Sequence, residues 1–346
     1  MSGANWDHTD LSAIAEGGWV HEDFMDRIWD ISRIPLPIAD LVGSQSHDNE
    51  YFSWATDELN APSLGGWVVD GADAGADESQ GGKRIGNHSG ILDKVVKVST
   101  RAQNVDHVDM NALAYQLRQR QRELRQDVDA NAVGNQGSTE SDANGGTPGV
   151  PASLPVMMAK IGTGGGGTGG TFSGGLWSDW TPGTKAVLTE TLIRDAAQAA
   201  YEDGGNPTHL STVPSIIRNL SEYMFTSSSR IATLIAETNQ NGPAQGMGSV
   251  NVFLTDFDSV LRFHPNRLQQ AYQSSGGAAG DAAVVMLIDP DYCALSYLHS
   301  YRVMELAKTG LADNRQMAVD WSAVVYEPKA HRALFDIDVA AAVTQA

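Results

Sequence analysis

The residues whose spacing comes closest to a chemical motif are Gly162, Gly164 and Gly167, which formally match the G-x-G-x-x-G pattern of dinucleotide-binding loops. Such a loop holds phosphates only where it follows a strand and opens a helix, and a phosphate-binding P-loop ends in Gly-Lys-Ser or Gly-Lys-Thr. The run from Gly162 to Gly170 has neither context, and a tract so rich in glycine matches almost any glycine pattern. We therefore interpret it as a flexible loop and expect no nucleotide cofactor.

The acidic, histidine and cysteine residues do not have the spacing of a catalytic or metal site. Asp256 and Asp258 resemble a pair of general acid–base carboxylates, but they flank Phe257 at an expected turn, where aspartate is favoured because it bonds the backbone. The nine histidines show no metal-ligand spacing. Cys293 is the only cysteine, which excludes an internal disulfide, and its apolar surroundings favour a small buried hydrophobe over a nucleophile. We therefore expect no enzyme activity, no cofactor and no metal.

A row of cations lies on one expected helix, and it could bind phosphate. The row consists of Arg118, Arg120, Arg122 and Arg125. The whole chain, however, has 42 acidic and 23 basic residues and a net charge of -19. A protein that wraps nucleic acid needs an excess of lysine and arginine. We therefore favour a solvated face that pairs with Glu123, Asp127 and acidic neighbouring subunits.

Length and composition allow a substantial core. The 346 residues, 41% of them hydrophobic, suffice for one large domain or two smaller ones. No stretch is long and apolar enough to cross a bilayer. Met1 to Asp10 lack the basic and apolar regions of a secretory signal. We expect a protein that is made and used in a cytoplasm, with no membrane contact.

Hydrophobic periodicity and turn residues predict a mixed α+β chain. Helices are expected from Glu22 towards Pro35 and at 110–133, 189–203 and 214–225. Strands are expected at 51–54, 67–69, 91–100, 250–254, 259–264, 284–288, 319–326 and 333–337. Residues 295–307 fit either a helix or a strand, and residues 134–184 contain few core-forming residues.

The segment from residue 50 to residue 100 has the pattern of a long two-stranded excursion. Its tip, Asp70 to Gly82, is rich in glycine and acidic residues, and residues 91–100 are expected to be the returning strand. An isolated hairpin is only marginally stable in water. It must therefore lie on another surface, which a neighbouring subunit could supply.

Six segments, in order, carry a resemblance to a known family. They are "EYFSWATDELNAP", "RIGNHSGILDKVVKVSTRAQNVD", "YEDGGNPTHL", "NVFLTDFDSVLRFHPNR", "DPDYCALSYL" and "ELAKTGLADNRQMAVDWSAVV". Within them, a W-x-T-D-x-L pattern falls on Trp54, Thr56, Asp57 and Leu59. Together they resemble the tailed-bacteriophage major capsid proteins typified by an elongated-head short-tailed coliphage. The likeness spans roughly residues 22–338 and is lost at the N-terminal arm and at residues 134–180.

The resemblance implies the Hong Kong 97-like major capsid fold, which is α+β. Residues 1–45 would form the N-terminal arm and residues 46–98 the extended loop. Residues 99–184 would form the peripheral domain, with the spine helix at 107–133. Residues 185–283 would form the axial domain, and residues 284–346 the return strands of the peripheral domain.

The same resemblance implies a structural role. The chain would assemble with itself, as pentamers and hexamers, into an icosahedral shell around double-stranded DNA, without sequence-specific contact. A portal, a separate scaffolding protein and a decoration protein would be further partners, and the protein would end in the virion after assembly in the host cytoplasm. The alternative is a β-rich decoration or binding protein of the virion, which would have repeated strands and no long helix. An enzyme would need a convergent polar site.

We expect the contacts between subunits to be noncovalent and to involve two groups of residues. Some proteins of this fold cross-link a loop lysine to an asparagine, and Lys83, Lys94 and Lys97 lie in the expected loop. That chemistry also needs a buried carboxylate placed by the assembled shell, which a sequence cannot show. The candidate contact residues are Trp54, Asp57, Lys83, Arg84, Arg118, Arg122 and Arg125.

Overall fold

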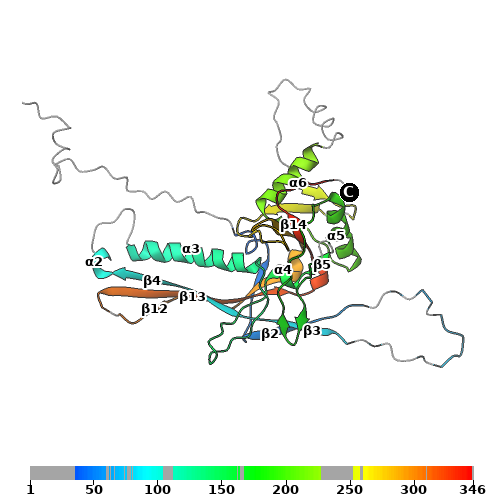
Figure 1. Cartoon of the computed structure of the whole chain (residues 1–346). Coiled ribbons are helices and arrows are strands. Elements are labelled where there is room, and N and C mark those ends of the chain that lie inside the picture. The colour runs from blue at the N-terminus through cyan, green and yellow to red at the C-terminus, as the bar shows by residue number, and fades with distance from the viewer. Residues whose placement is uncertain are drawn as a thin grey trace, which may run out of the picture.

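The computed structural model describes most of residues 36–344 and contains two main sheets and two small hairpins (Figure 1). The described residues exclude 60–61, 63, 66, 74, 76–78, 80, 104–111, 162, 164–166, 227–251, 258–259 and 309. The helix expected from Glu22, most of the expected arm, the start of the spine helix and much of the glycine run therefore lie outside them. Among the described residues, no helix combines the length and apolar character needed to cross a membrane.

A four-stranded sheet with one long helix on its face forms the first layer pair (Figure 1). Its strands, in order across the sheet, are β1 (Gly43–Ser46), β12 (Cys293–Glu305), β13 (Ala312–Val325) and β4 (Gly90–Ser99). β1 is parallel to β12, and the other pairs are antiparallel. The ambiguous segment 295–307 is thus largely strand, and β13 is longer than expected.

The helix on this sheet is α3 (Ala112–Ala132), which confirms the described part of the helix expected at 110–133, whereas its role as a spine helix stays a prediction. Leu124 and Val128, both in the predicted apolar stripe, are 1% exposed in a core shared with β12 and β13. Lys94 of β4 and Asp127 of α3 form an ion pair of 2.7 Å at the edge of this interface. The short helix α2 (Thr100–Gln103) follows β4.

A six-stranded sheet forms the second part of the molecule. Its strands, in order, are β5 (Ala159–Ile161), β14 (Arg332–Asp338), β11 (Ala282–Ile288), β8 (His209–Thr212), β10 (Val260–Pro265) and β9 (Val252–Leu254). The helices α5 (Glu190–Glu202) and α6 (Pro214–Thr226) pack beside it, as the sequence predicts. Thr189 caps α5, because its Oγ1 accepts a hydrogen bond of 3.2 Å from Leu192 N.

The strand β11 separates two hydrophobic cores, and its continuous apolar sequence is the reason. Val284, Met286 and Ile288 join the core beneath α3, whereas alternate residues such as Val285 and Leu287 join the core beneath α5 and α6. A strand buried on both faces needs apolar residues at every position, because successive side chains point to opposite faces. β11 also spans the expected boundary at 283/284, so the division into peripheral and axial domains stays a prediction.

The hairpin of β2 (Tyr51–Thr56) and β3 (Lys83–His88) leads into the extended loop, which projects from the body (Figure 1). Two expectations were wrong here. Trp67, Val68 and Val69 are not a strand but exposed coil. The returning strand is β3, whereas β4 pairs with β13, because Ser89 and Gly90 redirect the chain into the other sheet.

Residues 134–184 contribute more core than their composition suggested, which corrects that expectation. They contain α4 (Leu154–Met157) and a small hairpin of β6 (Phe172–Ser173) and β7 (Leu176–Trp177). Val156 and Met157 are at most 1% exposed, and Trp177 and Trp180 are also buried. Two short 3-10 helices, η1 (Pro290–Tyr292) and η2 (Pro328–Ala330), join the later strands.

Candidate functional site

The extended loop is rooted in the body of the subunit by aromatic side chains of β2. Trp54 is half-buried, and its Nε1 donates a hydrogen bond of 3.2 Å to the backbone oxygen of Tyr326. The Trp54 ring lies 5.4 Å from Phe52 and 6.4 Å from Tyr326, measured between centroids. Phe52 in turn stacks on His47 at 4.5 Å. Trp54 therefore anchors the loop within its own subunit, and its expected contact with a neighbour stays a prediction.

Asn87 on β3 fixes the hairpin from the other side. Its Nδ2 donates to Ala323 O at 2.8 Å and to Ala152 O at 3.2 Å, and its Oδ1 accepts from Ala152 N at 2.9 Å. The Asn87 side chain is fully buried. The neighbouring Gly86 must lack a side chain, because a Cβ there would lie 2.7 Å from the backbone oxygen of Phe52 on the paired strand. The loop thus leaves the subunit from a rigid base.

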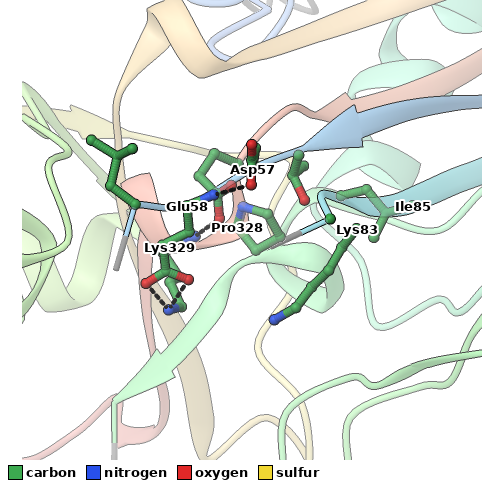
Figure 2. A pocket seen from close by; sticks show the side chains of 10 residues that line it. Asp57, Glu58, Lys83, Ile85, Pro328 and Lys329 are labelled. Carbon is green, nitrogen blue, oxygen red and sulfur yellow. Dashed lines mark hydrogen bonds and ion pairs between the residues drawn. The ribbon is translucent and has the colours of Figure 1, made fainter. Parts of the chain in front are cut away.

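A cavity of about 670 Å³ opens at this base, and Figure 2 shows its lining residues. They come from the end of β2, the start of β3 and η2. Lys329 Nζ binds Glu58 Oε1 at 2.6 Å, and this bond raises the pKa of Lys329. Asp57 Oδ1 accepts from Glu58 N at 2.9 Å, whereas Lys83 makes no ion pair with the other lining residues (Figure 2). Two candidate contact residues, Asp57 and Lys83, therefore share one charged hollow.

Arg84 completes this first group of candidate residues. It pairs across the hairpin with Ala55, next to Trp54, and its Nε donates to Ser53 Oγ at 2.7 Å. Its side chain is exposed. The structure thus brings Trp54, Asp57, Lys83 and Arg84 together at the loop base, although their inter-subunit role stays a prediction.

Beyond the base, the loop exposes large apolar side chains. The exposed fractions are 95% for Leu59, 96% for Leu64, 91% for Trp67, 85% for Val68 and 79% for Val69. Soluble monomers seldom expose contiguous apolar surface without a partner to cover it. The sequence pattern mistook three of these residues, Trp67, Val68 and Val69, for a strand. The loop is therefore the most obvious surface for a partner to cover.

The second group of candidate residues lies elsewhere, on α3. Arg118, Arg122 and Arg125 are spaced so that they share one side of the helix. Arg118 and Arg125 are exposed, Arg122 is half-buried, and the Arg125 guanidinium lies 5.4 Å from the centre of the Tyr301 ring. The expected pairing with Glu123 is confirmed for Arg120, at 2.5 Å.

Asp127 does not pair with these arginines, contrary to our expectation. Lys94 of the neighbouring strand binds it instead. Lys94 is thus engaged within its own subunit, on the face of the sheet that α3 covers, rather than available as a loop lysine.

The other residues that resembled chemical groups have structural surroundings. Asp256 lies 3.4 Å from Arg194 in an ion pair, and its expected partner Asp258 is outside the described residues. Cys293 is 2% exposed, and burial raises the pKa of its thiol to about 12, which agrees with a buried hydrophobe. Within the part of the chain that the structure describes, no three acidic, histidine or cysteine residues are grouped as metal ligands.

Asp129 of α3 is an important residue that the sequence pattern did not reveal. It is fully buried, and its Oδ1 accepts hydrogen bonds from Ile38 N at 3.1 Å and Ala39 N at 2.7 Å. Burial raises the pKa of this carboxyl to about 6. Asp129 therefore holds the first described turn of the chain against the spine helix.

Solved structures of capsids share this fold at low sequence identity, whereas no curated protein matches the chain in sequence. The capsid of a native GTA particle is 12% identical, with a TM-score of 0.57, over 94% of this chain and 98% of that one. The capsid of cyanophage P-SCSP1u is 13% identical, with a TM-score of 0.54, over 99% and 100%. The SrpI encapsulin of Synechococcus elongatus PCC 7942 is 10% identical, with a TM-score of 0.53, over 94% and 96%.

These likenesses identify the fold as the Hong Kong 97-like capsid fold, as the sequence resemblance implied. A family model adds the function. The model of the SU10 major capsid protein matches residues 4–338, which is nearly the whole chain. The chain therefore belongs to the SU10 major capsid protein family, a family of tailed-phage capsid proteins.

Proposed function

We propose that this major capsid protein closes an icosahedral shell by laying its extended loop across a neighbouring subunit in pentamers and hexamers. The observation that carries the proposal is the set of exposed apolar side chains in the loop, which are Leu59, Leu64, Trp67, Val68 and Val69. Burying one such side chain contributes about 1.5–3 kcal/mol. Several such side chains are exposed in each subunit, so burying them against a neighbour would favour association of the subunits.

The rigid base of the loop supports the same role. Trp54 and Asn87 hold the hairpin against β13 and neighbouring segments, so the loop leaves each subunit in a fixed direction. A fixed direction lowers the conformational entropy that assembly must remove. Lys83 and Asp57 at the base are available for charged contacts with the neighbour.

The net charge of -19 supports a shell that encloses double-stranded DNA without binding it tightly over most of its surface. A portal, a separate scaffolding protein and a decoration protein are the further partners that we propose, with assembly in the host cytoplasm. We also propose noncovalent contacts between subunits, and the ion pair between Lys94 and Asp127 supports this for one of the three loop lysines.

Assembly of purified, concentrated protein tests the proposal by negative-stain microscopy. The wild type should form shells, tubes or capsomers, and Trp67→Ser/Val68→Ser/Val69→Ser should stay monomeric. Because these side chains are exposed, the variant should melt at the wild-type temperature. Val187→Ser/Tyr201→Ser, which changes residues 41% and 56% exposed outside the loop, is the matched control and should assemble. Normal shells from the triple variant would contradict the proposal.

A further inference from the structure

The strand β4 presents an open edge to the outside of the molecule. It is the last strand of its sheet and pairs with β13 along one side only. Among the described residues, no hydrogen bond reaches the backbone of residues 91–98 from the other side. A 10-residue edge strand is long, and native proteins usually cover or pair such an edge.

One face of β4 is also apolar and uncovered. Val96 and Val98 point towards α3 and are buried, whereas Ile91 and Val95, on the other face, are 68% and 56% exposed. Lys97 follows on that same exposed face. Asp93 lies between Ile91 and Val95 on this face, where its Oδ2 accepts a hydrogen bond of 2.8 Å from Gln316 Nε2. An added strand would therefore meet two apolar side chains on either side of this engaged carboxylate, and then a cation.

The extended loop has the complementary sequence. Leu64, Val68 and Asp70 are spaced by four and then two residues, as are Ile91, Val95 and Lys97. Residues at even spacing share one face of a strand. Trp67, Val68 and Val69 are residue types favoured in strands, yet they belong to no strand of their own subunit and are highly exposed. The backbone of Val69 accepts a turn hydrogen bond of 3.0 Å from Ala72 N.

We propose that the loop of one copy adds to the β4 edge of a second copy as a parallel strand. Leu64 then lies beside Ile91, Val68 beside Val95, and Asp70 beside Lys97. This inference rests on the loop-mediated assembly proposed above, and it names the receiving surface. The direction is parallel because only that direction aligns both apolar positions and the opposite charges.

This arrangement also accounts for the loop residues between those pairs. Trp67 and Val69 alternate with Val68, so they point to the opposite face of the added strand. That is the side of the sheet on which α3 lies. The indole would thus be removed from water along the flank of the spine helix, which explains why a large aromatic residue occupies an exposed position in the single subunit.

Disulfide trapping in assembled particles tests the register. Paired residues of neighbouring strands lie about 5 Å apart, within the range that a disulfide spans. Cys293, the only native cysteine, is buried and does not compete. Oxidised shells of Val68→Cys/Val95→Cys should give covalent multimers on non-reducing gels. The wild type and each single variant should give monomers. Val68→Cys/Ile91→Cys is the matched control, because Ile91 lies on the same face one register step of four residues away.

Charge exchange provides a second test. Asp70→Lys and Lys97→Asp should each slow assembly at least about twofold, as expected for one exposed ion pair. The combination Asp70→Lys/Lys97→Asp should restore the wild-type rate. If Asp70 and Lys97 contacted other groups instead of each other, the double variant would not recover the wild-type assembly rate.

The outcomes separate this inference from the proposed function. Shells that form without disulfides in Val68→Cys/Val95→Cys, or that cross-link equally in the Ile91 control, would overturn the strand addition while leaving loop-mediated assembly intact. A disulfide within dilute monomers would also overturn it, because the loop would then pair with its own strand. A wild type that forms no assembly at any concentration would instead overturn the proposed function.

Discussion

The buried carboxyl of Asp129 makes stability depend on pH in a defined direction. Its pKa is about 6 in the folded chain against 3.8 for a free side chain, because burial disfavours the charged form. Between these pH values the folded state binds more protons than the unfolded state. The free energy of unfolding therefore falls as pH rises through this range, by up to about 3 kcal/mol for a shift of this size.

His331 acts in the opposite direction. It is fully buried, and burial lowers its pKa from 6.5 to about 4, so the unfolded chain binds the extra proton in that window. Its contribution to the free energy of unfolding rises with pH between these two values. In the wild type the two residues partly cancel.

Asp129→Asn should therefore make the pH dependence steeper. The amide oxygen still accepts from Ile38 N and Ala39 N, but the titrating group is gone. Chemical denaturation at several pH values between 4 and 7 should show stability rising more steeply with pH in the variant than in the wild type. Parallel curves would mean that the Asp129 pKa is not raised.

The roles of Asp129 and Asn87 could not be assigned from the sequence, because the groups that contact these residues are distant along the chain. Asp129 binds the backbone 91 residues before it, and Asn87 binds Ala323, which is 236 residues after it. An aspartate in a helix and an asparagine in a strand are ordinary surface residues until the fold encloses them. Trp54, by contrast, was identified as a candidate contact residue through the family resemblance.

Asn87→Ala should destabilise the subunit by about 2–4 kcal/mol, because it removes the hydrogen bonds that the buried backbone groups of Ala152 and Ala323 make with the Asn87 amide. Thermal and urea unfolding of the free subunit would measure this loss. Arg84→Ala, three residues earlier on the same strand and exposed, is the matched control and should change stability by less than about 0.5 kcal/mol. Equal effects of both variants would show that Asn87 does not hold the hairpin.

At the scale of elements, alternation predicted most strands but not their pairing. Residues 90–99 are rich in β-branched residues, whereas Ile85 is the only one in residues 83–88, and a single residue, Ser89, separates the two strands. Gly90 makes the change of sheet possible, because a Cβ there would lie 2.6 Å from Pro151 Cδ. The alternation of apolar and polar residues shows which face of a strand each residue occupies. It does not show which other strand will pair with it. The helices at 190–202 and 214–226 were predicted better, because their caps and stripes are local.

Shortening the extended loop should separate assembly from folding. The described residues among 71–82 are all exposed, so replacing 71–82 by Asn-Gly removes none of their side chains from a buried site. The melting temperature of the free subunit should stay close to that of the wild type, whereas closed shells should fail to form, because the reach to the neighbour is reduced. Calorimetry and electron microscopy measure the two effects. An unfolded variant would place this segment in the core, and normal shells would show that the reach supplied by residues 71–82 is not needed for assembly.

For the whole molecule, the net charge of -19 opposes assembly, because every subunit carries the same excess. Exposed charges interact over about 8 Å at physiological ionic strength and over longer distances in dilute salt. Assembly should thus be slow at low salt and faster with moderate salt or divalent cations, as light scattering would measure. Asp48→Asn/Glu140→Gln, which changes two exposed acids, should assemble faster than the wild type at low salt and equally fast at high salt. Fastest assembly at the lowest salt would mean that attraction by the arginine row of α3 exceeds the net repulsion.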